Sequence, residues 1–479
     1  LKMAPDMAAV AKTGARGVRF DFDNPATIAP PKDAPVRYAW QRVVEYSDFS
    51  DWAAISRHFA PLYAKASRLA PGSPLRQEAQ RIAAAHAEPL DRARAALELV
   101  QQEVRYIYVG LDGGNLTPAT AEETWQRRYG DCKGKTALLL GLLAELGIEA
   151  EPVLASNSGA DDGLDERLPS PRLFDHVLVK ARIGGAGYWM DGTLPPVAGP
   201  SLDPVLPYRW TLPLSARGST IERRAWRPPE SPDAVTLVEI DARAGFDAPA
   251  RKTTMMIVRG LAGLQQQIQL SGLTPAQLLS GLQQKMVGDT WHTVDEARWR
   301  YDEAAQASVM TIVGTGPADW EDEGDGSWSM ILPGGGFNPP ARRVRPADQD
   351  QDLPYYNAPE FSCHVTTVRL PEGTKPEHWS FNTEFDTSIF GRTYYRGFDL
   401  RDGAIRMVRG SRVEKQEIDA ETARRDNKRI AAFDNSMARI SYDPADETPE
   451  ADAGPPVPAT WEIDWTAPAV PCLASMTKG

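Results

Sequence analysis

Hydrophobic residues recur every three to four positions through much of the first third of the chain, a spacing typical of amphipathic helices. One such segment starts near Asp51, where Ser50 is placed to cap the first turn. A second follows Ser73 and Pro74, and a third starts at Pro89, all residue types that favour helix starts. The pattern therefore predicts three helices ahead of an apolar, strand-like run, VRYIYV.

A fourth helix is predicted from about Asp131 to Leu146, in the stretch GDCKGKTALLLGLLAELG. Gly147 is well placed to close it in the left-handed conformation. The pattern then changes to short apolar runs, AEPVLAS, RLFDHVLVKARI and YWMDGT, which are typical of strands. Helices followed by strands indicate an α+β fold rather than a parallel α/β one.

Strand-like runs dominate the second half of the chain. Its clearest helix, LTPAQLLSGLQQKMVG, starts with a capping-box pattern of Thr274 and Gln277, with Pro275 in the first turn. From Tyr355 onward, short strands at close spacing indicate a β-sandwich or a similar fold. The acidic, proline-rich stretch DPADETPEADAGPPVPAT is typical of a linker.

These patterns divide the chain into five parts. They are the end of a preceding β-rich domain at 1–45, an α+β domain at 46–225, an α+β or β-rich domain at 226–350, a β-sandwich-like domain with a terminal helix at 351–444, and a linker and tail at 445–479. Because the chain starts at Leu1 without a helix or strand start, we interpret it as a fragment that lacks any export signal of the longer protein.

Composition narrows the class of partner. Of 479 residues, 42% are hydrophobic and 25% are charged, which is ordinary for a globular chain, and the net charge is −12. That acidity disfavours nucleic acid, and no basic block indicates a membrane-surface patch. No apolar run is long enough to predict a membrane-spanning segment.

Cysteine and acidic patterns give no reason to expect a metal or a cofactor. The three cysteines, Cys132, Cys363 and Cys472, are too few for a disulfide framework, and no CxxC pair indicates a zinc site. The acidic stretch EDEGDGS at 321–327 lacks the spacing of a calcium-binding EF-hand loop. We therefore predict no metal site and no cofactor.

Cys132 is the strongest candidate for chemistry, because it lies where the fourth helix is predicted to begin. A thiolate is a far better nucleophile than a thiol, and the dipole and free N–H groups of a helix N-terminus stabilise a negative charge. The same N–H groups could hold an oxyanion. A cysteine on a helix is nevertheless most often a small core residue, so a base is needed to support this interpretation.

His176 is the candidate base. The other histidines lie in helical patterns ahead of Cys132 or in the second half of the chain, at His58, His86, His292, His364 and His378. His176 lies in an apolar strand, LFDHVLV, where a lone polar ring needs a partner. His364 cannot pair with its neighbour Cys363, because adjacent residues of a strand point to opposite faces.

Asp191, on the next predicted strand, is the candidate that orients the imidazole. An even-length turn puts both side chains on one face of the sheet. A turn centred at Ile183–Gly184 places them opposite each other, whereas one centred at Gly185–Ala186 separates them by four residues.

Asp175 and Asp131 are the rival acids for that role. Asp175 should face away from the side of the strand that carries its neighbour His176, and Asp131 should lie in the turn that enters the helix. Each candidate residue alone is more often structural than functional. Together, in the order Cys–His–Asp on helix, strand and strand, they favour a thiol-based catalytic site.

The segments YGDCKGKTALLLGLLAELGIEAEPVL, LPSPRLFDHVLVKA and YWMDGTLPP resemble the transglutaminase-like superfamily, over roughly residues 46–220. The likeness is to bacterial members with a flanking N-terminal domain of unknown function and a β-rich C-terminal domain. It implies a papain-like fold, with the helix that carries the cysteine packed on an antiparallel sheet. It also implies that Cys132 is the nucleophile, His176 the base and Asp191 its orienter. The superfamily's oxyanion donor is often an upstream side chain; Gln126, Trp125 and a backbone N–H stay open.

We therefore expect thiol-dependent acyl transfer on a protein or peptide amide, by a peptidase or amidase if water accepts the acyl group and by a transglutaminase if an amine does. The alternative is an exported binding or scaffold protein that keeps the fold and has lost turnover. The resemblance also implies a periplasmic or otherwise exported location. Cys363 and Cys472 are expected to be dispensable for activity.

Overall fold

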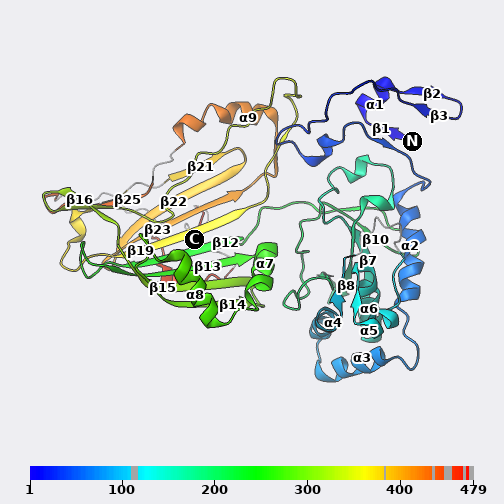
Figure 1. The fold of residues 1–479 in the computed structure, drawn as a ribbon, viewed down its shortest axis with the longest axis horizontal. Coiled ribbons are helices and arrows are strands. Elements are labelled where there is room, and N and C mark those ends of the chain that lie inside the picture. Colours follow the sequence, from blue (N-terminus) through cyan, green and yellow to red (C-terminus); the bar gives the residue numbers. More distant parts are fainter. Residues whose placement is uncertain (109–116, 382–384, 434–436, 447–455, 468–470, 474–479) are drawn as a thin grey trace. The chain divides into compact units, whose positions relative to one another are not determined.

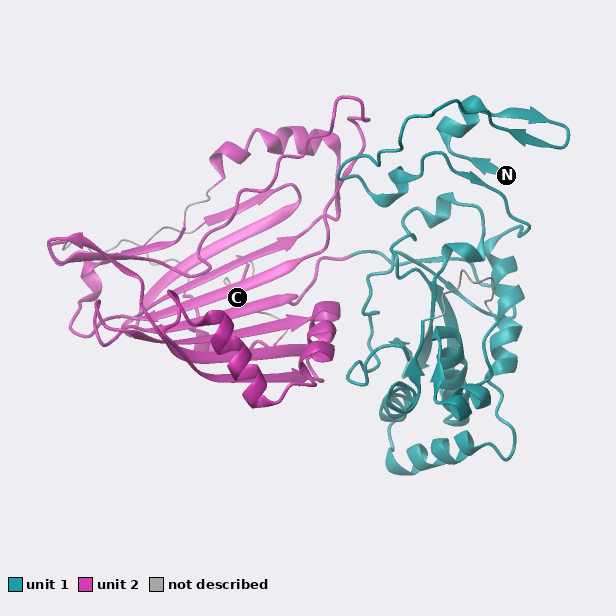
Figure 2. Cartoon of the chain, in the orientation of Figure 1, with its two compact units in different colours: residues 1–226 teal, residues 227–479 magenta. Residues whose placement is uncertain are grey.

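The computed structural model describes residues 1–108, 117–381, 385–433, 437–446, 456–467 and 471–473. The chain forms two compact units, Leu1–Trp226 and Arg227–Gly479 (Figure 2). Helices and mostly antiparallel sheets occur together in the chain, which confirms the α+β class (Figure 1). Among the described residues, no helix combines the length and apolarity needed to cross a membrane.

Unit 1 places one central helix against a five-stranded sheet. Its main helices are α2 (Trp52–Ala66), α3 (Pro74–Ala85), α4 (Pro89–Glu103), α5 (Ala121–Arg127) and α6 (Cys132–Glu145). The sheet has the order β11-β10-β7-β8-β9 and contains β7 (Glu149–Ala155), β8 (His176–Ile183), β9 (Ala186–Met190), β10 (Trp210–Pro213) and β11 (Glu222–Arg223). A parallel pair, β5 (Arg105–Tyr106) and β6 (Tyr129–Gly130), precedes α6.

Helix α6 is the centre of unit 1. It packs against α2, α3, α4 and α5 and against strands β7 and β8. Every residue from Cys132 to Leu143 is buried, as expected for a helix that is covered on all sides. Its leucines belong to one core with side chains of the surrounding helices and the sheet, so this core fixes the start of α6 relative to the strands.

The helix starts largely follow the sequence pattern. Ser73 caps α3, and Gly147 after α6 has a φ of 71° in the left-handed region. The N-cap of α2 is Asp51 rather than the predicted Ser50: its carboxylate accepts from the amide of Ala54, because only that side chain reaches the open N–H of the first turn.

Residues 1–45 belong to unit 1. They form β1 (Lys2–Met3), α1 (Pro5–Val10), a hairpin of β2 (Lys12–Gly14) and β3 (Gly17–Arg19), a 3-10 turn η1 (Val36–Ala39) and β4 (Val44–Glu45), which pairs with β1. Ion pairs link this segment to the loop between β7 and β8: Arg37 to buried Asp162, and Glu45 to Arg167. The loop that leads to β8 is thereby held from the N-terminal side.

Unit 2 is built on an eight-stranded sheet of order β14-β15-β13-β12-β19-β23-β22-β21. Its strands are β12 (Ala234–Asp241), β13 (Ala250–Arg259), β14 (Thr293–Asp302), β15 (Ala307–Gly316), β19 (Phe361–Arg369), β21 (Phe385–Ile389), β22 (Arg392–Arg401) and β23 (Ala404–Val413). A four-stranded sheet contains β16 (Trp320–Gly324), β17 (Ser327–Ile331), β25 (Arg439–Tyr442) and β20 (Trp379–Phe381). The helices are α7 (Gly260–Leu270), α8 (Pro275–Met286) and α9 (Ala420–Asn427), and β18 (Tyr355–Tyr356) pairs with β24 (Glu417–Ile418).

The two sheets of unit 2 share a core, which matches the sandwich-like architecture predicted from Tyr355 onward. The capping box of Thr274 and Gln277 at the start of α8 is also confirmed. The boundary predicted near residue 350 differs from the structure, because one sheet crosses it: β12 pairs in parallel with β19, more than 100 residues later. A parallel pairing between distant segments leaves no local pattern in the sequence.

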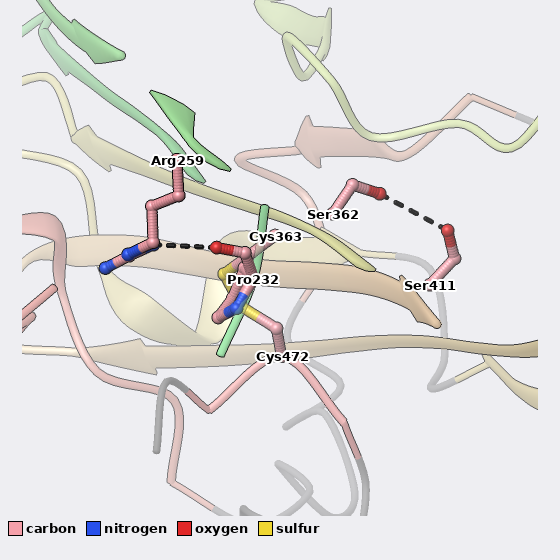
Figure 3. The surroundings of a disulfide bond; sticks show 6 residues. All are labelled: Pro232, Arg259, Ser362, Cys363, Ser411 and Cys472. Atoms are coloured by element: carbon pink, nitrogen blue, oxygen red, sulfur yellow. Dashed lines mark hydrogen bonds between the residues drawn. A yellow bond between two sulfur atoms is a disulfide. The ribbon is translucent and has the colours of Figure 1, made fainter. Parts of the chain in front are cut away.

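The predicted linker and tail, 445–479, is partly packed structure. In the described residues 456–467 and 471–473, Val457, Ala459 and Cys472 are fully buried. Cys472 forms a disulfide with Cys363 on β19, with 5.4 Å between the two Cα atoms (Figure 3). A Cβ at Gly410 on β23 would overlap the Cys472 carbonyl oxygen, so glycine permits this close approach. Residues 447–455 of the predicted linker lie outside the described residues.

Candidate active site

Cys132 is the first residue of α6 and is 3% exposed. Asp131 caps the helix by accepting from the amide of Gly134 at 3.0 Å, and its carboxylate also pairs with the Lys133 ammonium at 2.5 Å. The cap leaves the first amides of the helix without intrahelical acceptors, as at any helix N-terminus. The thiol therefore lies where backbone dipoles stabilise a negative charge.

Close packing against α5 fixes the turn that carries the thiol. A Cβ at Gly134 would lie 2.7 Å from Thr124 Oγ1, and one at Gly130 would lie 2.8 Å from Thr124 Cγ2. Both contacts are shorter than ordinary van der Waals distances, so the two glycines let α5 approach the start of α6. The GDCKG stretch is thus also a packing motif.

His176 and Asp191 are in direct contact: His176 Nε2 lies 2.8 Å from Asp191 Oδ2. The imidazole is 2% exposed and opens β8, and Asp191 directly follows β9. The Cys132 side chain lies close enough to the ring to favour its charged form. Because Nε2 faces Asp191, Nδ1 is the ring nitrogen that is left to exchange a proton with the thiol.

A two-glycine turn sets this pairing. Gly184 and Gly185 have φ angles of 59° and 83°, and Ile183 pairs with Ala186 across them. The turn is centred at neither of the two predicted positions. The last pair of the two strands is Val179 with Met190. If the same register continued beyond this pair, Asp191 would lie two residues away from the position directly opposite His176. That diagonal offset keeps both side chains on one face and within reach of each other.

Asp191 is held on both carboxylate oxygens. Oδ1 accepts from the amide of Thr193 at 2.9 Å and from its hydroxyl at 2.7 Å, which leaves Oδ2 for His176. Burial by itself raises the pKa of the Asp191 carboxyl, but His176 and Thr193 outweigh it, so this pKa lies below its ordinary value. The carboxylate is therefore ionised at neutral pH.

The same pair makes the imidazole basic. Burial favours the neutral ring, but Asp191 and the Cys132 side chain favour the charged form and together raise the pKa of His176 to about 10. At neutral pH the ring is therefore an imidazolium between a carboxylate and a sulfur atom. Such an arrangement can hold a thiolate and later return a proton.

Both rival acids have other partners. Asp175 accepts from the amides of Asn157 and Ser158, at 2.6 and 3.1 Å, and so fixes the loop that leaves β7. Asp131 caps α6. Of the three acids, it is Asp191 that contacts the ring.

The candidates for an oxyanion donor differ in exposure. Gln126 is exposed on α5, whereas Trp125 is 9% exposed and stacks against the guanidinium of Arg128, 3.6 Å from the ring centre. The amides at the start of α6 adjoin the thiol itself. Of the three candidates, a backbone N–H at the start of α6 is therefore favoured as the donor to the oxyanion. This assignment stays a prediction.

Sequence reasoning missed three polar residues around Asp191. Thr193 had a local signal, because an Asp followed two residues later by Thr is typical of a turn closed by side-chain hydrogen bonds. Gln101 on α4 and Lys135 on α6 had none. Gln101 donates to the carbonyls of Asp191 and Ala198, and Lys135 donates to the Val104 carbonyl.

Three tyrosines lie in the electrostatic field of the site. For Tyr63, Tyr106 and Tyr208, burial and then nearby negative charge, including that of Cys132, raise the pKa of the phenol. Within the described residues, no cluster of three or more His, Cys, Asp or Glu side chains could hold a metal ion.

No protein-family model and no curated protein sequence matches the chain. Among solved structures, the chain is similar to a "putative protease" from Parabacteroides distasonis ATCC 8503, with a TM-score of 0.44, 14% identity and coverage of 82% of this chain and 59% of that one. It is also similar to a "putative cysteine protease" from Cytophaga hutchinsonii, with a TM-score of 0.19, 16% identity and coverage of 36% and 49%. The chain thus spans 59% of the length of the first structure. At these TM-scores neither likeness bears on activity.

Proposed function

We propose that unit 1 is a thiol-dependent acyl-transfer enzyme that acts on amide bonds, with Cys132 as nucleophile, His176 as general base and acid, and Asp191 as the group that orients the ring. One observation carries the proposal: the buried imidazole contacts the Asp191 carboxylate at 2.8 Å, and the side chain of Cys132, at the N-terminus of α6, favours the charged form of the same ring. A nucleophile, a base and an orienting acid in that order define a catalytic triad.

In the first half-reaction, the Cys132 sulfur attacks the carbonyl carbon of the amide. In this proposal, His176, whose pKa is raised to about 10, takes the thiol proton as the sulfur attacks. The oxyanion that forms is stabilised by amides at the start of α6. The imidazolium then gives its proton to the leaving nitrogen, the C–N bond breaks, and an acyl-thioester remains on Cys132.

In the second half-reaction, the neutral imidazole takes a proton from the acceptor as the acceptor attacks the thioester carbonyl. The C–S bond then breaks, the acyl group leaves on the acceptor, and Cys132 is released as a thiolate beside the imidazolium. Water gives a carboxylic acid and makes the protein a peptidase or amidase. A primary amine gives a new amide and makes it a transglutaminase. The resemblance to the transglutaminase-like superfamily supports both hydrolysis and transfer to an amine. The two reactions are distinguished by identifying their products.

One observation favours the alternative function, a binding or scaffold protein without turnover. The Cys132 thiol is 3% exposed, which is typical of a structural cysteine. Labelling by iodoacetamide at mildly acidic pH separates the two: a thiolate held by an imidazolium reacts selectively, whereas a core thiol does not.

We also propose that the protein is exported, to the periplasm or an equivalent compartment. The disulfide between Cys363 and Cys472 supports this location, because such bonds persist in oxidising compartments and are rare in the cytosol. Fractionation of cells that express the full-length protein tests the proposal. A purely cytosolic product with both thiols reduced would contradict it.

The enzyme proposal is tested by turnover of a peptide amide and of a glutamine peptide with an amine acceptor. We expect Cys132→Ala to abolish both reactions, while Cys363→Ser, which removes a cysteine in unit 2, retains them. Full activity of Cys132→Ala would overturn the assignment.

A further inference from the structure

Gln101 lies on α4 and joins two ends of the loop that carries Asp191. Its Nε2 atom donates to the carbonyl oxygens of Asp191 and Ala198, at 3.0 Å each. The residue is 8% exposed, so these bonds form away from bulk water. The Asp191 carbonyl also accepts from the amide of Leu194, at 3.3 Å, so loss of Gln101 would weaken the hold on Asp191 and leave the Ala198 carbonyl without this donor.

The orientation of this amide is set by its partners. Both neighbours are carbonyl oxygens, which only accept, so the nitrogen must face them. The other amide atom, Oε1, is buried without a hydrogen-bond partner. A buried unsatisfied oxygen is uncommon in folded proteins. An apolar side chain at this position would remove it, but would also remove both donated bonds to the loop that carries Asp191.

The same turn has little freedom on its other sides. A Cβ at Gly192 would lie 3.1 Å from Val100 Cγ1 and 3.6 Å from Lys135 Cβ, so α4 and α6 both press against the residue after Asp191. Thr193 fixes one carboxylate oxygen from within the loop. Gln101, which lies outside the loop on α4, holds the Asp191 backbone by a hydrogen bond to its carbonyl oxygen.

We propose that Gln101 is a positioning residue, which holds the Asp191 turn so that the carboxylate stays directed at His176. The inference rests on the proposed function in so far as the triad is catalytic, but the positioning itself concerns the His176–Asp191 pair. Because this carboxylate raises the pKa of His176, a loosened turn should make the imidazole less basic. A purely structural glutamine would affect stability and leave the ring titration unchanged.

The test follows the His176 ring by NMR in full-length protein labelled with ¹⁵N-histidine. The His176→Gln spectrum assigns its signal among the six histidines. Gln101→Met keeps an unbranched side chain of similar length and removes the donor. The matched control is Gln102→Met: Gln102 is the next residue of α4, is exposed, and donates to Glu98 instead.

We expect Gln101→Met to lower the titration midpoint of His176 by about one pH unit or more, and Gln102→Met to leave it unchanged. An unchanged midpoint in folded Gln101→Met would overturn the inference. Should that variant not fold, Gln101→Leu, which also removes the donor and adds no charge, is expected to show the same decrease. If neither variant folds, Gln101 is a determinant of folding, and the positioning role is refuted.

These outcomes are separable from a failure of the proposed function. A wild-type His176 that titrates near an ordinary histidine would refute the electrostatics of the triad itself. A protein that shows the expected NMR shifts but turns over no amide would refute the activity and leave the positioning role intact.

Discussion

Replacing Asp191 by asparagine changes one atom at the centre of the proposed mechanism. The side-chain oxygen of the introduced asparagine could still accept from Thr193, as Asp191 Oδ1 does at 2.9 and 2.7 Å. The NH₂ group would then face His176 Nε2, which must become an acceptor. The ring proton moves to Nδ1 and points at Cys132, so the imidazole is in the wrong tautomer to take the thiol proton.

The magnitude follows from the charge that is lost. The folded protein raises the pKa of the buried His176 ring from 6.5 to about 10, which corresponds to roughly 5 kcal/mol in favour of the imidazolium. Asp191 is the main source of this increase, against the opposing effect of burial. We therefore expect Asp191→Asn to lower kcat/KM about a hundredfold to ten-thousandfold.

The assay compares Asp191→Asn, His176→Ala and the double variant on one amide substrate. Residues on one proton-transfer path are non-additive, so the double variant should be little worse than His176→Ala alone. Asp175→Asn is the matched control, because Asp175 adjoins His176 in sequence but binds the amides of Asn157 and Ser158. Additive losses in the double variant, or an equal loss in Asp175→Asn, would refute the reasoning.

Four further outcomes are expected. Cys132→Ala should abolish turnover while circular dichroism and the thermal midpoint stay close to wild type; a large loss of stability would assign the cysteine to the core instead. Cys363→Ser should leave activity intact but lower the free energy of unfolding by about 4 kcal/mol, because the disulfide closes a loop between residues 109 positions apart, and urea titration with and without reductant measures this. Gly134→Ala should destabilise the protein by about 1–3 kcal/mol through its contact with Thr124, whereas Gly281→Ala, in an open position of α8, should be neutral or stabilising by about 0.5–1 kcal/mol in the same titration. The raised pKa of His176 stabilises the folded protein fully below about pH 6.5, and this stabilisation is lost as pH rises through about 10. In urea titrations, the free energy of unfolding of wild type should therefore exceed that of Asp191→Asn by less and less across that range.

Local signals in the sequence were sufficient for the starts of several helices. Serine, threonine and proline at helix starts act within one turn, so the starts of α3 and α8 follow directly from residue types. The Asp131–Cys132 step is of the same kind, because an N-cap residue and the first helical residue are neighbours in the chain.

Register and long-range pairing were beyond such signals. The turn of Gly184 and Gly185 sets which residues face each other across β8 and β9. Each of the two predicted turn centres differs from the observed one by a single residue, in opposite directions. The bond between Cys363 and Cys472 depends on where the tail packs, as does the parallel pairing of β12 with β19. Gln101 was missed for a related reason: its partners are backbone carbonyls about 90 residues later, which any residue type could supply.

Intact-protein mass spectrometry of the full chain, quenched in acid during turnover of an activated peptide amide, tests most directly whether Cys132 carries the acyl group. We predict one acyl group per chain, which peptide mapping places on Cys132 as a thioester that hydroxylamine removes. The adduct should be absent in Cys132→Ala and strongly reduced in His176→Ala. An adduct on another residue, or an undiminished Cys132 adduct in His176→Ala, would contradict the proposed roles of the thiol and the imidazole.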